Sequence, residues 1–387
     1  MEESNRKTPK SISLGSLDNR SQGLKNYLKL WPNVLRQLEN LSLSLKREKI
    51  INPYASAKST LELLRYTVGT CKWTNAGQLM EIVKSIGREL MVAKQSELVV
   101  SNIVKRVLFV IREEYSSGYS LQLGDNLASD INCPSLEKVL GGELIEQDFL
   151  SFIPELKQNV IEGLNELKAE LEDTQSAICE HAWDTIHANE IILTRGYSST
   201  VENFLISAYE HYAKKQLSFS VIVVEAAPTL SGHAMAKKLA ETGIEATVIN
   251  DSAVYAIMSR VNKVIMATNA VVANGGLVSE SGSHMIALAA HELCVPVVCV
   301  AGMYKLCPLF PHDQDTFNFL LSPVSVLSYK NFEAIPSCVE VLNPAFDYIP
   351  PELVSLYMTN IGGHQPSYIY RLLAEYYHRD DYTLSFE

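Results

Sequence analysis

The second half of the chain alternates short β-branched runs with helical segments, and this alternation restricts the possible folds more than any other feature. From Asn189 onward, five apolar runs have the composition of strands: NEIILT, SFSVIVVEA, EATVIN, KVIMAT and PVVCVAG. Runs that are apolar throughout and alternate with helices are typical of a parallel sheet covered on both faces. We therefore predict a doubly wound, Rossmann-like α/β domain over residues 188–387, with PVVCVAG as its last strand.

The first half has a helical pattern, with apolar residues at three- and four-residue spacing from about Leu24 to His187. One such face predicts a buried helix surface made of five residues, namely Leu79, Ile82, Val83, Ile86 and Leu90. The pattern predicts an all-helical domain over residues 24–187, preceded by a polar, flexible leader at residues 1–23. A polar stretch at residues 116–144 breaks the periodicity, and we expect an exposed insertion there.

Composition and charge exclude several function classes. The net charge is −11 and the basic residues are scattered, which argues against direct binding of nucleic acid. The seven cysteines form no C-x-x-C pair and their number is odd, so neither a zinc site nor a disulfide framework is expected. No apolar run has the roughly 20 residues that span a bilayer. We expect a cytosolic protein with no membrane contact and no metal.

The carboxyl ends of parallel strands are where ligands of such sheets bind. They fall here at five segments: Arg195–Thr200, Ala226–Gly232, Asn250–Asp251, Thr268–Gly276 and Gly302–Lys305. The chain has no G-x-G-x-x-G after the first strand and no P-loop, so no nucleotide cofactor is expected. The NGG at 274–276 is either a plain turn or a close approach to a phosphate.

Two helix starts carry capping residues in this domain. Asp251 and Ser252 are placed to cap the helix SAVYAIMSRV, which follows the third strand. The SGSH segment at 281–284 ends the segment NGGLVSESGS, which we expect to be a Gly-rich loop, and leads into the helix HMIALAAHEL. Ser281 or Ser283 is expected to cap that helix, and the alternative is an anion bound at its N-terminus.

Two regions could contact other subunits. His187 ends the long helical run and is either a half-buried histidine or part of a subunit contact. The tail FDYIPPELVSLYMTNIGGHQPSYIYRL is rich in tyrosine, and tyrosine and arginine concentrate at buried interfaces. Its Tyr348, Tyr368, Tyr370 and Arg371 are candidates for an interface, although the segment could equally close the domain core.

Several segments of the chain resemble a known protein family, and the resemblance extends over the whole chain after the leader. These segments are the tyrosine-rich tail, NEIILTRGYSSTVENFL, VEAAPTLSGHAMAKKLAETGIEATVINDSAV and SRVNKVIMATNAVVANGGLVSESGSHMIALAAHE. The chain resembles the alpha/beta/delta family of translation initiation factor 2B, and is most similar to the beta members. That factor is the guanine-nucleotide exchange factor for initiation factor 2. The same fold is shared with methylthioribose-1-phosphate isomerase and ribose-1,5-bisphosphate isomerase.

The resemblance also implies that catalysis has been lost. The isomerases use a cysteine after the first strand of this domain and an aspartate after the fourth, and these positions match Gly196 and Asn269. Neither replacement can transfer a proton. An Asn-Lys pair that helps to hold the phosphorylated sugar matches Ser279 and Glu280, which puts an anion where the enzymes have a cation. We expect a vestigial pocket at Gly196, Asn269, Asn274 and Gly275, with no catalytic and no cofactor-binding residue.

The implied role is a regulatory subunit that scaffolds the exchange factor and senses phosphorylation of the alpha subunit of initiation factor 2. The implied partners are the alpha, gamma, delta and epsilon subunits of initiation factor 2B, together with initiation factor 2. The alternatives are a sugar-phosphate isomerase and a metabolite-binding sensor of the same fold.

Overall fold

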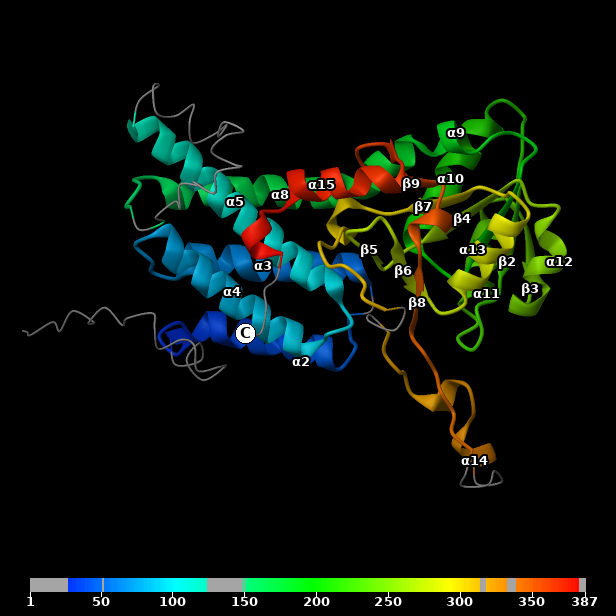
Figure 1. The fold of residues 1–387 in the computed structure, drawn as a ribbon, viewed down its shortest axis with the longest axis horizontal. Helices are drawn as coiled ribbons and strands as arrows, with labels where there is room; N and C mark the ends of the chain where they lie inside the picture. The colour runs from blue at the N-terminus through cyan, green and yellow to red at the C-terminus, as the bar shows by residue number, and fades with distance from the viewer. Residues whose placement is uncertain are drawn as a thin grey trace, which may run out of the picture. The chain divides into compact units, whose positions relative to one another are not determined.

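The computed structural model describes residues 27–50, 52–123, 149, 151–313, 318–332 and 339–382 (Figure 1). The leader predicted at residues 1–23 lies outside the described residues. The chain divides into two compact units: residues 1–94 with 107–165, and residues 95–106 with 166–387. This division falls inside two helices, α5 (Leu98–Leu123) and α8 (Leu156–Glu180). The single boundary that we expected at residue 187 stays a prediction.

The first unit is helical in its described residues. It contains α2 (Pro32–Lys46), α3 (Pro53–Thr70) and α4 (Ala76–Ala93), with part of α5 and part of α8. Proline stands in the first turn of both α2 and α3, where its missing N–H costs no hydrogen bond. The apolar face predicted for α4 is confirmed, because all five of its residues are buried. Helix α5 continues to Leu123, so residues 116–123 are helical, and the prediction of an insertion was wrong for them. The remainder of that stretch, residues 124–144, lies outside the described residues.

The second unit contains a seven-stranded sheet in the order β10-β9-β7-β4-β1-β2-β3. All five predicted strands form, as β1 (Ile191–Arg195), β2 (Ser220–Val224), β3 (Glu245–Ile249), β4 (Lys263–Ala267) and β7 (Val297–Val300). They pair in parallel, and β9 (Leu356–Met358) extends the parallel series beside β7. Only β10 (Gly363–His364) is antiparallel within this sheet. The predicted α/β class is therefore confirmed.

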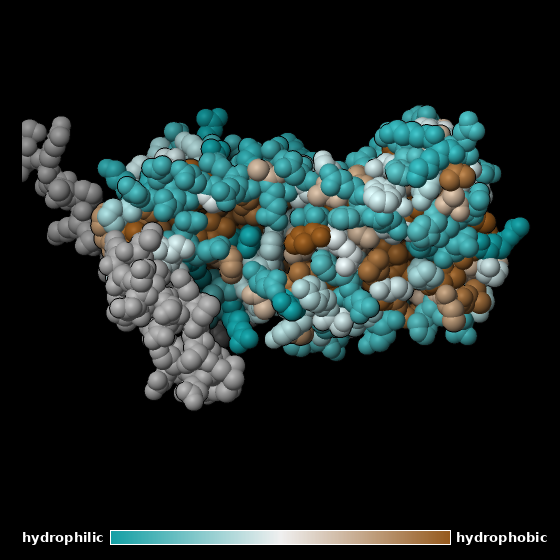
Figure 2. Space-filling view, turned by 90° about the horizontal axis from the view of Figure 1, so that it is seen from above, coloured by the Kyte–Doolittle hydropathy of each residue, from teal (hydrophilic) through white to brown (hydrophobic). Residues whose placement is uncertain are grey.

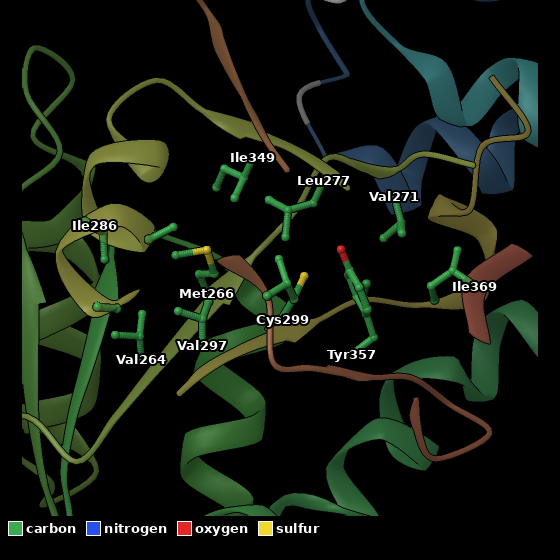
Figure 3. Close-up of a cluster of buried hydrophobic side chains, with 14 of the residues drawn as sticks. Val264, Met266, Val271, Leu277, Ile286, Val297, Cys299, Ile349, Tyr357 and Ile369 are labelled. Atoms are coloured by element: carbon green, nitrogen blue, oxygen red, sulfur yellow. The ribbon is translucent and has the colours of Figure 1, made fainter. Parts of the chain in front are cut away.

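The two faces of this sheet bury different helices. Along each strand the side chains alternate, so Ile192 and Ile265 pack with α9 (Ala182–Thr185), α10 (Ser199–Ala213) and α11 (Ser231–Glu241). Leu193, Val264 and Met266 face the opposite cluster, which includes α12 (Val254–Met258), α13 (Ser283–Glu292) and α15 (Ile369–Tyr376). Figure 3 shows side chains of this second cluster, with Tyr357 and Cys299 among the aliphatic residues.

A smaller antiparallel sheet belongs to the same unit. It consists of β5 (Ala270–Val271), β6 (Leu277–Glu280) and β8 (Phe346–Ile349), in that order. Its residues Val271, Leu277 and Ile349 belong to the cluster of Figure 3. The segment NGGLVSESGS, which we expected to be a loop, therefore contains a strand, because pairing with β5 and β8 imposes strand geometry that four residues alone do not encode.

Two further sequence predictions were wrong in this unit. PVVCVAG is not the last strand, since β9 follows it; three residues are too few to give a strand signal of their own. Asp251 and Ser252 do not cap α12, which is preceded by a 3₁₀ turn at Asp251–Ala253 and has no side-chain cap. The Asp251 carboxylate instead accepts a hydrogen bond from the Ala227 N–H at 2.8 Å.

On the face drawn in Figure 2, hydrophilic residues dominate and hydrophobic ones form small patches among them. Among the described residues, no helix combines the length and the apolar character that crossing a membrane requires.

Candidate functional site

The strand order reverses direction at β1, which marks the place where a sheet of this kind binds ligands. Strands β2 and β3 lie on one side of β1, and β4 and β7 lie on the other. Gly196 follows β1 and Asn269 comes shortly after β4, and these two strands pair directly in parallel. Two of the four residues of the expected vestigial pocket therefore come from adjacent strand ends at the switch point, where ligand crevices form.

Arg195, the last residue of β1, is the central charged residue at this strand end. Its side chain is only 6% exposed. The Nε atom lies 3.6 Å from Oδ1 of Asp251, and Nη1 lies 3.6 Å from Oε2 of Glu280. Charge-assisted hydrogen bonds are about 2.7–2.9 Å long, so both contacts are ion pairs without a good hydrogen bond. Arg195, Asp251 and Glu280 are called the strand-end triad below.

Two glycines make room for the triad. Gly196 has φ +60°, and a Cβ atom there would lie 3.0 Å from Oγ of Ser231 and 3.3 Å from Oε2 of Glu280. Gly282 has φ +96°, and a Cβ atom there would lie 2.9 Å from Nη2 of Arg195. Both positions need left-handed backbone in a crowded place, which favours glycine. The backbone geometry at position 196 therefore favours glycine.

The N-terminus of α13 is capped by a residue that sequence reasoning missed. Oδ2 of Asp347, in β8, accepts hydrogen bonds from the N–H groups of Gly282 at 2.6 Å and His284 at 3.2 Å. The expectation that Ser281 or Ser283 caps this helix was wrong: Gly282 is the N-cap residue, and Ser283 donates its hydroxyl hydrogen bond to Ser279. No local signal could have identified Asp347, because 65 residues separate it from Gly282.

The end of β4 is held by hydroxyl and ammonium groups. The Asn269 N–H donates to the Val278 carbonyl at 2.9 Å, and Oγ of Ser279 donates to the Ala267 carbonyl at 2.9 Å. Lys305 is buried and its Nζ donates to the Thr268 carbonyl at 2.8 Å. Burial lowers the pKa of Lys305. The buried Lys305 side chain therefore contacts the residue that precedes Asn269, and Lys305 itself lies in one of the segments that the sequence marked as a strand end.

Asn274 and Gly275 lie elsewhere, in the turn between β5 and β6, at the opposite end of β6 from Glu280. Oδ1 of Asn274 accepts from the Gly276 N–H at 2.9 Å, and its Nδ2 donates to the hydroxyl of Tyr348 at 2.6 Å. Gly275 has φ +82° and its carbonyl accepts a hydrogen bond from the Tyr357 hydroxyl at 2.6 Å. These contacts are those of a tight turn.

A shallow hollow of about 260 Å³ opens beside this turn. It brings Asn274 and Tyr348 together, and its lining is completed by His284, Pro311, His312, Asp313 and Pro350. The four residues of the expected pocket are therefore divided between the carboxyl ends of β1 and β4 and the β5–β6 turn, and their binding role stays a prediction.

The candidate interface residues fall in three places. Tyr368 stacks on His364 with ring centroids 5.3 Å apart, and the Arg371 guanidinium lies 5.5 Å from the Tyr368 ring. Tyr370 is 57% exposed on α15, near this aromatic group in sequence. Tyr348 lines the hollow described above, and His187 is exposed, with its N–H bound to Glu190 Oε2 at 3.0 Å. Exposure of Tyr370 and Arg371 leaves them accessible to a partner, and that role stays a prediction.

The residues at these strand ends offer little chemistry of the isomerase type. Gly196 has no side chain, and the Asn269 amide neither gives nor takes a proton near neutral pH. Cys299 is fully buried, and burial raises its pKa to about 12, so its thiol packs as an apolar group. In the parts of the chain that the structure describes, no three His, Cys, Asp or Glu residues are grouped as metal ligands.

Comparison with known proteins gives consistent results. Residues 52–366 match the initiation factor 2 subunit family. The chain is 44% identical to translation initiation factor eIF2B subunit beta of Dictyostelium discoideum over 89% of this chain and 95% of that protein. It is 30% identical to ribose 1,5-bisphosphate isomerase of Archaeoglobus fulgidus over 58% of this chain and 69% of that protein. Among solved structures it resembles a chain of the tetrameric eIF2B-beta2-delta2 complex of C. thermophilum, with a TM-score of 0.66 and 27% identity, covering 95% of this chain and 100% of that chain.

Proposed function

Because this chain belongs to the initiation factor 2 subunit family, on the branch of its beta members, we propose that it is a regulatory subunit of the guanine-nucleotide exchange factor for translation initiation factor 2. In this role it does not catalyse a reaction. It forms part of a scaffold with the alpha, gamma, delta and epsilon subunits in the cytosol, and it responds to phosphorylation of the alpha subunit of initiation factor 2. The observation that carries the proposal is the 44% identity, which extends over 89% of the chain.

The residues at the carboxyl ends of β1 and β4 support the non-catalytic part of this proposal. The resemblance places Gly196 and Asn269 where the isomerases have a cysteine and an aspartate. A Cβ atom at residue 196 would crowd Ser231 and Glu280 in left-handed backbone, so a cysteine here would be strained and would displace these side chains. The carboxylate of Glu280 lies at the position where the resemblance places a lysine that helps to hold the substrate. These features disfavour binding and isomerisation of a phosphorylated sugar.

Co-purification tests the proposal directly. The tagged chain, isolated gently from its own cells, should bring four other subunits in fixed ratio and initiation factor 2 in smaller amounts. The isolated assembly should accelerate GDP release from initiation factor 2, and phosphorylation of the factor's alpha subunit should reduce that rate. Recovery of the chain as a homo-oligomer, with isomerase activity on a sugar phosphate, would contradict the proposal.

The exposed part of α15 gives a sharper form of the experiment. The substitution Tyr370→Ala removes a side chain that is 57% exposed, so it should lower the yield of co-purified subunits without lowering the melting temperature of the isolated chain. Leu43→Ala is the matched control, because Leu43 is similarly exposed, at 47%, and belongs to the other unit. Unchanged subunit recovery with Tyr370→Ala would remove this residue from the interface.

A further inference from the structure

The hollow of about 260 Å³ beside the β5–β6 turn has the size of a site for one side chain. It is bounded by that turn, the first turn of α13, the end of β8 and residues 311–313. Pockets that enclose a whole small-molecule ligand measure about 300–1,000 Å³, so this hollow suits a smaller group. Asn274, His312 and Asp313 in its lining are exposed, so it opens to solvent. These properties fit a side chain that another protein presents better than they fit a cofactor.

One wall of the hollow, the Tyr348 ring, is held in place by the chain itself. A Cβ atom at Gly276 would lie 2.6 Å from Cε2 and 2.7 Å from the hydroxyl oxygen of Tyr348, so the ring lies against bare backbone. The Tyr348 hydroxyl also accepts a hydrogen bond from Nδ2 of Asn274 at 2.6 Å, and Oδ1 of Asn274 accepts one from the Gly276 N–H at 2.9 Å. Tyr348 is only partly buried. A fixed tyrosine ring of this kind is a typical anchor of a protein interface, because little freedom is lost when a partner binds.

The charge of the lining favours a cation. Among the described residues that line the hollow, Asp313 is the only one with a formal charge when histidine is counted as neutral. The net charge of the whole chain is −11, which adds a long-range attraction for cations. His284 and His312 contribute ring nitrogens, which accept hydrogen bonds in the neutral imidazole. An anionic ligand is therefore disfavoured here.

The combination of an aromatic ring and a carboxylate distinguishes between the two basic side chains. A lysine ammonium is a compact, strongly hydrated charge, whereas an arginine guanidinium is planar, stacks on aromatic rings and forms paired hydrogen bonds with a carboxylate. Both kinds of group line this hollow, as Tyr348 and Asp313.

We propose that the hollow is a docking site for an arginine side chain of a partner protein, whose guanidinium stacks on the Tyr348 ring and pairs with the Asp313 carboxylate. The site gives Tyr348, which the sequence marked as a candidate interface residue, a ligand of defined chemistry. It is separate from the proposed role in the exchange factor, because the test below uses the chain alone and its result does not depend on that role.

The test measures binding of N-acetyl-arginine methylamide to the purified chain by saturation-transfer difference NMR, which detects weak ligands. The corresponding citrulline derivative is the matched probe, because it has nearly the same shape and no charge. The unaltered chain should bind the arginine derivative at least about fivefold more tightly than the citrulline derivative. Asp313→Asn should remove this preference, and Tyr348→Ala should weaken binding of the arginine derivative by about fivefold or more. The lysine derivative should bind more weakly than the arginine derivative to the unaltered chain.

The matched control is Asp380→Asn. Asp380 is 66% exposed in the 3₁₀ turn Arg379–Asp381, and its substitution changes the net charge by the same amount as Asp313→Asn. It should leave the preference for arginine unchanged. If Tyr348→Ala lowers the melting temperature, Asp313→Asn still decides, because it alters an exposed side chain and keeps the ring.

Three results would overturn the proposal. Equal effects of Asp313→Asn and Asp380→Asn would show a general attraction of cations to an acidic chain. Equal binding of the arginine and citrulline derivatives to the unaltered chain would exclude recognition of the charge. Equal binding of the lysine and arginine derivatives would exclude stacking of a guanidinium on Tyr348.

Discussion

The Tyr357 hydroxyl gives the most quantitative prediction, because its contribution to stability should change with pH in a defined way. Tyr357 lies in β9, is fully buried in the cluster of Figure 3, and donates a hydrogen bond to the Gly275 carbonyl at 2.6 Å. Tyr357→Phe removes the donor and leaves that carbonyl buried without it. At pH 7 the substitution should lower the free energy of unfolding by about 2 kcal/mol.

This cost should decrease in alkaline solution. Burial raises the pKa of Tyr357 well above its usual value. Above about pH 10 the unfolded chain loses the phenol proton while the folded chain keeps it, so the unaltered protein loses about 1.4 kcal/mol of stability per pH unit from this group. Phenylalanine has no such proton. The destabilisation caused by Tyr357→Phe should therefore vanish at about pH 11.5.

Urea unfolding followed by far-UV circular dichroism at several pH values between neutrality and this point measures the difference. Other groups titrate equally in both proteins, so they cancel in the comparison. Tyr370→Phe is the control, because an exposed hydroxyl should contribute less than about 0.5 kcal/mol at any pH. A difference that stays constant with pH would refute the reasoning that Tyr357 is held neutral by burial.

Two further predictions concern a glycine at a close backbone contact and the side chain that caps α13. Gly232→Ala should lower the free energy of unfolding by about 3 kcal/mol or more, or prevent folding, because the new Cβ atom would lie 2.2 Å from the Val224 carbonyl oxygen. Gly69→Ala in α3 is the control, because its Cβ atom would meet nothing within 4 Å and should stabilise the chain slightly. Thermal melts of the two variants measure the difference, and equal melting temperatures would contradict the prediction. Asp347→Ala should lower the free energy of unfolding by about 1–2 kcal/mol, because α13 loses the hydrogen-bond acceptor at its N-terminus, and Asp347→Asn should lower it less. Faster amide hydrogen exchange at Gly282 in the alanine variant would confirm the mechanism, and unchanged exchange would contradict it.

The parts of the fold that the sequence could predict are those encoded locally. Helix α4 repeats its apolar residues at helical spacing, and all five residues of the predicted face are buried. The five predicted strands of the large sheet are four or five residues long and consist mostly of apolar or β-branched residues, which is a signal that survives without tertiary context. By contrast, β6, β9 and β10 have four, three and two residues and exist because a neighbouring strand pairs with them.

The location of the candidate site could be predicted from the sequence, but its side-chain contacts could not. Parallel topology alone located the strand ends, and Arg195, Ser231, Asp251 and Lys305 all fall in the segments expected there. The pairing of Arg195 with Glu280 depends on how β6 of the second sheet approaches β1, and the Asp347 cap joins residues 65 positions apart. Such contacts are set by the packing of the two sheets, for which no periodicity exists in the chain.

The two replacements that the resemblance implies at Gly196 and Asn269 are not the only differences that we propose between these strand ends and an isomerase site. If catalysis had simply been lost, restoring a cysteine at Gly196 and an aspartate at Asn269 would recover the isomerase arrangement implied by the resemblance. The structure argues against this, because a side chain at Gly196 would meet Ser231 and Glu280 in left-handed backbone. The cation implied for the substrate phosphate is replaced by an anion that already pairs with Arg195. A return to catalysis would therefore require changes at the triad before the proton-transfer groups could act.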